Sequence, residues 1–198
     1  MSALAELYRE IENCQDCALA RSRIKVVPGE GAEDADLFFI GEAPGWHEDQ
    51  QGRPFVGPAG QFLEKLLASI GLRREQVYIS NVIKCRPPQN RDPLPAEIEV
   101  CRKWLDRQIE LIRPRIIVTL GRYSLARYFP HESISKVHGK ARKMGDVIYY
   151  PMYHPAAALH QGNLSNIIEA DMLKIPEILA QAEGVREVDS ESRQLNLF

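Results

Sequence analysis

The nine residues LFFIGEAPG (37–45) join a short, wholly apolar run to a glycine-rich turn. Runs of four to eight apolar, β-branched or aromatic residues that end at turn signals are typical of buried strands. Three more such runs follow along the chain, at Val77–Val82, Ile116–Leu120 and Val147–Met152. We therefore expect four strands, the first of them at Leu37–Ile40.

Helical patterns lie before and between these runs. Leu4, Leu7, Tyr8 and Ile11 recur at helical spacing, so an amphipathic helix is expected to open the chain. The other predicted helices are Gly60–Ile70, Pro95–Ile112, Arg122–Tyr128 and Leu164–Ala182, the last with a kink or break at Pro176. Strands that alternate with helices indicate an α/β fold, with a mainly parallel sheet covered by helices on both faces.

Length and composition suit one globular domain with a sizeable core. The chain has 198 residues, of which 44% are hydrophobic and 26% are charged. We predict a single domain over residues 1–181, followed by a flexible tail at 182–198 that begins as a polar tether. The formal charge of −2 gives no overall positive field, so contacts with nucleic acid would have to come from local basic loops.

The N-terminus carries acidic residues early and has no long apolar run. Neither a signal peptide nor a membrane span is therefore expected, and we predict a cytoplasmic protein. Nothing in the sequence demands more than a monomer.

Four cysteines form a close CxxC pair and two distant single positions, with none left over. In a reducing compartment such a set favours metal binding over disulfides. Four thiolates suit either a structural zinc ion or a [4Fe–4S] cluster, and the spacing leaves both open. The four residues are Cys14, Cys17, Cys85 and Cys101.

Polar residues stand just past the predicted strands. Glu42 follows the first strand, Asn81 lies near the end of the second, and His154 follows the fourth. Ligands of such sheets bind beyond the carboxyl ends of the strands, so we expect these three side chains to share one rim. Each has an ordinary structural alternative as well: a surface acid, a turn cap and a hydrogen-bonded histidine.

Phe55 lies between glycines and prolines in GRPFVGPAG (52–60), outside any regular periodicity. The segment alone favours a core anchor under a loop and a stacking platform for a planar ring about equally. Two locally basic segments, Lys84–Arg91 and Lys136–Lys143, are either solvated faces or phosphate contacts beside the rim.

From about Cys14 to Leu159 the sequence resembles the family 4 uracil-DNA glycosylases, the iron–sulfur branch of the uracil-DNA glycosylase superfamily. The resemblance is carried by six landmarks in the family's order: CxxC at 14–17, GEAPG at 41–45, GRPFVGPAG at 52–60, NVIKCRPPQNR at 81–91, Cys101, and HPAA at 154–157. It implies a three-layer α/β/α sandwich around a central, mainly parallel four-stranded sheet. It also implies a DNA repair enzyme that flips deoxyuridine out of the helix and hydrolyses its N-glycosidic bond.

The resemblance further implies the chemistry of particular positions. Glu42 matches the acid near the attacking water, and His154 matches the histidine near O2 of the base, so these two are the expected catalytic residues. The ligands expected for a [4Fe–4S] cluster are Cys14, Cys17, Cys85 and Cys101.

The remaining matches concern substrate binding. Phe55 matches the aromatic residue that stacks on uracil, and Asn81 matches the amide that reads the pyrimidine edge. Glu48 is expected to crowd C5 and so to reject the methyl group of thymine. Gly41 and Ala43, in the glycine-rich turn, are expected to allow a close approach to the substrate. Leu159, just past HPAA, is the expected wedge that fills the gap left by the flipped nucleotide.

The sequence also allows a rival function and indicates a possible protein partner. The alternative to an enzyme is a domain that is stabilised by a bound metal and binds DNA without cleaving it. Such a domain would keep the cysteines but would not need Glu42 and His154. The final residues QLNLF resemble the bacterial sliding-clamp-binding motif, in which apolar anchors on a polar tether dock into a groove. The expected clamp contacts are Gln194, Leu195, Leu197 and Phe198.

Overall fold

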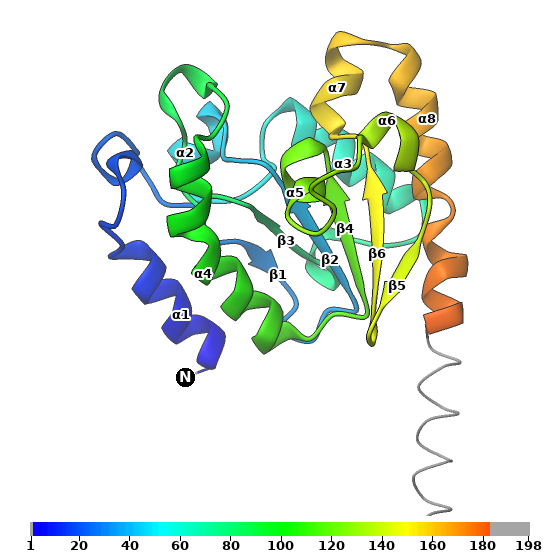
Figure 1. The fold of residues 1–198 in the computed structure, drawn as a ribbon, viewed down its shortest axis with the longest axis horizontal. Coiled ribbons are helices and arrows are strands. Elements are labelled where there is room, and N and C mark those ends of the chain that lie inside the picture. Colours follow the sequence, from blue (N-terminus) through cyan, green and yellow to red (C-terminus); the bar gives the residue numbers. More distant parts are fainter. Residues whose placement is uncertain (1, 183–198) are drawn as a thin grey trace, which may run out of the picture.

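The computed structural model describes residues 2–182 and contains one six-stranded sheet with helices on both faces (Figure 1). The strand order is β1-β3-β2-β4-β6-β5. The four central strands, β3, β2, β4 and β6, are parallel to one another, whereas β1 and β5 are antiparallel edge strands. The bounds are β1 Glu30–Gly31, β2 Leu37–Gly41, β3 Tyr78–Asn81, β4 Ile116–Leu120, β5 Arg142–Met144 and β6 Val147–Met152.

The α/β class and the four central strands are confirmed, but the prediction of a four-stranded sheet was wrong. The two additional strands are very short and carry no apolar run: β1 is Glu-Gly and β5 is Arg-Lys-Met. β5 overlaps the end of the segment Lys136–Lys143, which was interpreted from sequence as a basic run. Short, charged edge strands are common because they discourage pairing with other chains, and they leave little hydrophobic signal.

The two faces of the sheet form separate cores, because successive strand residues point to opposite faces. Leu37 and Phe39 of β2 pack with α3 (Pro58–Ser69) and α8 (Asn163–Met172). Phe38 and Ile40 pack instead with α1 (Ala3–Glu12) and α4 (Pro95–Ile112). β2 and β4 are buried along their whole length, which explains why their sequences are almost entirely apolar.

The shorter elements connect this framework. They are α2 Trp46–Gln51, α5 Arg122–Ala126, α6 Ile134–Val137 and α7 Pro155–His160, with 3-10 turns at Ala18–Arg21, Arg74–Gln76 and Pro88–Asn90. After α8 the chain turns at residues 173–174 and is helical again over 175–182, so the predicted break near Pro176 is confirmed. Within the described residues, no helix combines the length and the apolar character needed to cross a membrane.

The parallel strands bring distant parts of the sequence to one edge. Gly41 of β2 lies opposite Asn81 of β3, and Leu120 of β4 lies opposite Met152 of β6. The residues that follow these positions therefore emerge side by side, as the sequence predicts for Glu42 and His154.

Candidate functional site

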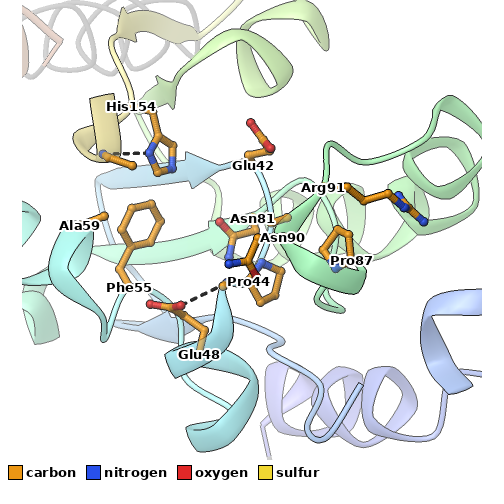
Figure 2. A pocket seen from close by; sticks show the side chains of 13 residues that line it. Glu42, Pro44, Glu48, Phe55, Ala59, Asn81, Pro87, Asn90, Arg91 and His154 are labelled. Carbon is orange, nitrogen blue, oxygen red and sulfur yellow. Dashed lines mark hydrogen bonds between the residues drawn. The ribbon is translucent and has the colours of Figure 1, made fainter. Parts of the chain in front are cut away.

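A cavity of about 200 Å³ opens at the carboxyl edge of the central strands (Figure 2). It brings together six of the eight catalytic and substrate-binding residues predicted from sequence. Segments far apart in the chain supply them: the turn after β2, the loop before α3, the end of β3 and the start of α7. The six are Glu42, Ala43, Glu48, Phe55, Asn81 and His154.

Asn81 ends β3 and is only 2% exposed. Its Oδ1 is buried, and no donor within residues 2–182 reaches it. A buried amide oxygen without a partner is costly, so the cavity carries an acceptor ready for a ligand N–H. Only glycine fits at position 41 beside Asn81. A Cβ there would lie 2.4 Å from Asn81 Oδ1 and 2.7 Å from the Phe55 ring, and both distances are too short for non-bonded atoms.

Phe55 lines the cavity and also belongs to the core between the sheet and α3, so it is a core anchor, and its stacking on a planar ring stays a prediction. Its backbone has a φ of 51°, a left-handed conformation that a bulky side chain adopts only under constraint. The buried guanidinium of Arg74 supplies part of that constraint by donating to the carbonyl oxygens of Pro54 and Phe55. Arg74 is itself paired with Glu30, with 3.4 Å between Nε and Oε1.

Glu48 binds the backbone N–H groups of the loop that presents Phe55. Its Oε1 accepts the N–H groups of Val56 and Gly57 at 2.9 Å, and its Oε2 accepts the N–H of Gly45 at 3.1 Å. The carboxylate is thus fixed in the cavity wall by three backbone donors. The loop that presents Phe55 is anchored through both its carbonyl and its amide groups.

His154 stands across the cavity from Asn81, with its ring stacked near Phe55 at a centroid distance of 5.4 Å (Figure 2). The Ala156 N–H donates to Nδ1 at 3.1 Å. Burial lowers the pKa of His154 to about 4, although the nearby Glu48 charge works against that shift. The imidazole is therefore neutral at pH 7, and because Nδ1 is an acceptor, Nε2 carries the hydrogen.

Glu42 follows β2 and is half-buried at the cavity. Burial raises the pKa of its carboxyl, and the negative charge of Asp92 raises it further, while Arg122 acts in the opposite direction. Asp92 and Arg122 form an ion pair of 2.5 Å beside the site. This pair was not singled out in the sequence, where its two members lie thirty positions apart.

Two predicted substrate residues do not line the cavity. Gly41 lies behind it, as described above. Leu159 is 51% exposed and lies on α7, the helix that also carries the lining residue Ala156. Three further lining residues come from the loop after β3 and were not among the predicted site residues: Pro87, Asn90 and Arg91. Their position in the basic segment 84–91 was the available signal.

Lys84 corrects one interpretation of that segment. The sequence placed it among basic residues facing phosphate, but its side chain is 1% exposed and turned into the protein. Its Nζ donates a hydrogen bond to the backbone carbonyl of Asn81 at 2.9 Å. Arg91 remains partly accessible, although it is paired with Glu97 at 2.7 Å.

The four cysteines are free thiols packed in one neighbourhood, although they come from three parts of the chain. Burial raises the pKa of Cys101 to about 11, and the charges of Cys85 and Cys17 add to that shift. Arg23 Nη1 donates to Cys85 Sγ at 3.1 Å, and its Nη2 donates to the Cys14 carbonyl at 3.0 Å. Among residues 2–182 no three cysteine, histidine, aspartate or glutamate side chains converge closely enough to hold a metal ion.

Comparisons with known proteins agree with this geometry. The model of the uracil DNA glycosylase superfamily matches residues 28–172. A type-4 uracil-DNA glycosylase of Sulfurisphaera tokodaii is 48% identical over 90% of this chain and 86% of its own length. A relative of the same name from Archaeoglobus fulgidus is 46% identical over 92% of this chain and 96% of its own length. Another, from Thermotoga maritima, is 43% identical over 86% of this chain and 90% of its own length.

The state of His154 can be measured directly. In a pH titration followed by ¹⁵N NMR of the imidazole, we expect the ring to remain neutral down to about pH 4, with hydrogen on Nε2, because burial disfavours its charged form. A His154→Ala variant assigns the signal. Replacing Glu48 with Gln should lower the midpoint further, since the charge that raises the pKa is removed. A midpoint above pH 6 would contradict the assignment.

Proposed function

We infer that this chain, which belongs to the type-4 uracil-DNA glycosylases of the uracil DNA glycosylase superfamily, excises uracil from DNA and leaves an abasic site. The observation that carries this conclusion is the amide of Asn81, buried at the cavity with an unpaired Oδ1. Uracil offers an N–H at N3 to that oxygen and a carbonyl at C4 to the amide N–H. Cytosine presents the reverse pattern of donor and acceptor at these two positions.

The pocket residues have distinct roles in this proposal. A flipped uracil stacks on Phe55 and pairs with Asn81. As the bond between C1′ and N1 breaks, its electron pair moves onto the base and negative charge develops at O2. The neutral Nε2–H of His154 donates to that oxygen, in a setting where water is largely excluded and the interaction is correspondingly strong. Ionised Glu42 stabilises the positive charge on the sugar, orients the water that adds to C1′ and accepts the proton that this water loses, while the uracil anion takes up a proton from solvent on release.

Glu48 accounts for selection against thymine. Its carboxylate lines the cavity and is held by three backbone N–H groups, so this wall cannot easily move aside for an added methyl group at C5. Leu159 is the proposed wedge, because an exposed apolar side chain beside the rim can replace the stacking lost when a base leaves the helix. That loss is on the order of a few kcal/mol.

We propose that Cys14, Cys17, Cys85 and Cys101 hold a [4Fe–4S] cluster. The charges of Cys14 and Cys17 act on Cys85, and those of Cys85 and Cys17 act on Cys101, so the four thiols lie near enough to serve one group. The resemblance to the iron–sulfur branch, together with relatives named type-4 uracil-DNA glycosylase, favours the cluster over a zinc ion. When bound, the cluster supplies a structural link between the N-terminal segment, the loop after β3 and α4. The reducing conditions that such thiolates need support a cytoplasmic location.

Activity is tested with an oligonucleotide that contains one deoxyuridine, followed by alkali to break the abasic site. We expect strand cleavage with the wild-type chain and none when thymidine replaces deoxyuridine. His154→Ala and Asn81→Ala should each lower the single-turnover rate by about 10²–10³-fold, because each removes a polar contact to the base. His160→Ala and Asn163→Ala, both exposed and outside the cavity, are the matched controls. Intact DNA with the wild-type chain would favour a non-cleaving DNA-binding module.

The pH dependence of the rate should report Glu42. Ionised Glu42 is the active form and its pKa is raised, so activity should fall with decreasing pH already above the usual range of a glutamate. Asp92→Asn removes a charge that raises this pKa and should shift the acid limb to lower pH. Glu42→Gln should abolish the limb along with most of the rate. An acid limb that survives in Glu42→Gln would assign it to another group.

The cysteine assignment predicts a brown protein with about four iron atoms per chain and broad absorbance near 400 nm. Replacing Cys101 by Ser should lower the iron content and the thermal stability together, since a ligand is lost from the link between α4 and the loop. Iron and zinc are quantified by mass spectrometry on protein purified without oxygen. A colourless protein with one zinc ion would overturn the assignment.

We also propose that the C-terminal residues bind the bacterial sliding clamp, which would raise the effective concentration of the enzyme near newly made DNA. The expected contacts Gln194, Leu195, Leu197 and Phe198 lie outside the described residues, so this proposal rests on the sequence QLNLF alone. Deleting residues 194–198 should abolish clamp binding in surface plasmon resonance and leave excision from free DNA unchanged. Undiminished clamp binding by the truncated chain would contradict it.

A further inference from the structure

Trp46 is a large aromatic side chain that is exposed beside the cavity. It is 53% exposed and begins α2, directly after the turn 43–45, whose residues line the cavity. Glu48, two positions further along the same helix, lines the cavity as well. Residues two apart on a helix point in different directions, so Glu48 forms part of the wall while the indole of Trp46 faces solvent at its outer edge. One exposed apolar residue is ordinary in itself, and its position beside the cavity is the informative feature.

The short helix that carries Trp46 is fixed to the rest of the protein. The buried carboxylate of Asp49 accepts the N–H of Ile24 at 2.9 Å. Glu48 accepts the N–H of Gly45 at 3.1 Å and two more backbone N–H groups from the loop that presents Phe55. An aromatic ring on an anchored helix loses little conformational freedom when a ligand packs against it, which suits a binding surface.

Another helix that lines the cavity also carries an exposed apolar side chain. This is Leu159 on α7, the proposed wedge. Figure 2 shows Glu48 of α2 and His154, at the start of α7, on different sides of the cavity. A nucleotide that leaves the helix removes a stacking partner from each of its two neighbours. A pocket for a flipped base therefore has a use for a second apolar surface besides the wedge.

We propose that the indole of Trp46 stacks on a base next to the flipped deoxyuridine in the same DNA strand. Consecutive nucleotides of one strand are only about 3.4 Å apart along the helix axis, so a side chain at the outer edge of the cavity lies within reach of these neighbours. Every base has a π-face, so such stacking strengthens binding without adding a sequence preference. The inference rests on the proposed excision of uracil and adds a DNA contact outside the base pocket.

The emission of Trp46 reports this contact directly. The chain has two tryptophans, and the other, Trp104, is 7% exposed. In a Trp104→Phe variant the tryptophan emission comes from Trp46. The probe is an oligonucleotide with one deoxyuridine analogue that carries fluorine at C2′ of the sugar, because an electron-withdrawing group there disfavours the positive charge that cleavage requires. We expect binding to quench the emission, and an abasic nucleotide on one side of the analogue to abolish the quenching.

The affinity for the same oligonucleotide gives an independent readout. Trp46→Ala should weaken binding about tenfold in fluorescence anisotropy, and Trp46→Phe should recover most of that loss, because phenylalanine keeps an aromatic face. At saturating deoxyuridine DNA both variants should keep a single-turnover rate near that of the wild type, since Trp46 does not contact the reacting base. Leu173→Ala is the matched control, because this apolar side chain is 59% exposed and lies outside the cavity.

If Trp104→Phe does not fold, ¹⁹F NMR of the wild-type chain labelled with fluorotryptophan provides the readout, with the Trp46 signal assigned by Trp46→Phe. A signal that does not respond to the oligonucleotide, or a response that survives an abasic nucleotide on either side, would overturn the inference. A response to protein concentration without DNA would also overturn it, because it would mark Trp46 as a contact between two copies of the chain. A wild-type chain that releases no uracil refutes the proposed function, whereas uracil release with an unresponsive Trp46 refutes this inference alone.

Discussion

The close approach between Gly41, Asn81 and Phe55 is the constraint on which the site depends. Parallel pairing of β2 and β3 sets Gly41 beside Asn81, and the absence of a side chain at Gly41 lets the amide and the aromatic ring come within van der Waals reach of its backbone. Asn81 can then face the cavity from a buried strand end. The core packing of the sheet and the chemistry of the pocket therefore share the same residues, and neither can be altered independently.

Three charged side chains hold this arrangement through hydrogen bonds to backbone groups. Arg74 binds the carbonyl groups of the loop that presents Phe55, and Glu48 binds its amide groups. Lys84 binds the carbonyl of Asn81. Charge-assisted hydrogen bonds to backbone suit this purpose, because they are strong and directional and are not screened by water. The unfavourable backbone angle of Phe55 persists because the loop is held from both sides.

The sequence predicted what depends on regular patterns. The four central strands follow from continuous apolar runs, and the rim of Glu42, Asn81 and His154 follows from the rule that parallel strands end together. Pairing between distant polar residues has no such pattern. Nothing in the order of residues indicates that Lys84, in a basic loop, turns inward to Gln108 on a helix twenty-four positions away. The two edge strands were missed for a related reason, since their short polar sequences leave no hydrophobic signal.

Hydrolysis of a glycosidic bond transfers no electrons, so a proposed cluster in such an enzyme calls for a physical explanation. The superfamily match covers residues 28–172, which contain the pocket but not the N-terminal cysteine pair, Cys14 and Cys17. A network of hydrogen bonds through Tyr8, Tyr78 and Gln108 to Lys84 joins the two regions. The hydrogen bonds of this network run from α1 through β3 and α4 to Lys84, and from Lys84 to the backbone of Asn81 at the end of β3. The proposed cluster would link the same elements through its cysteine ligands, so its role would be to hold the framework of the pocket in place rather than to take part in the hydrolysis.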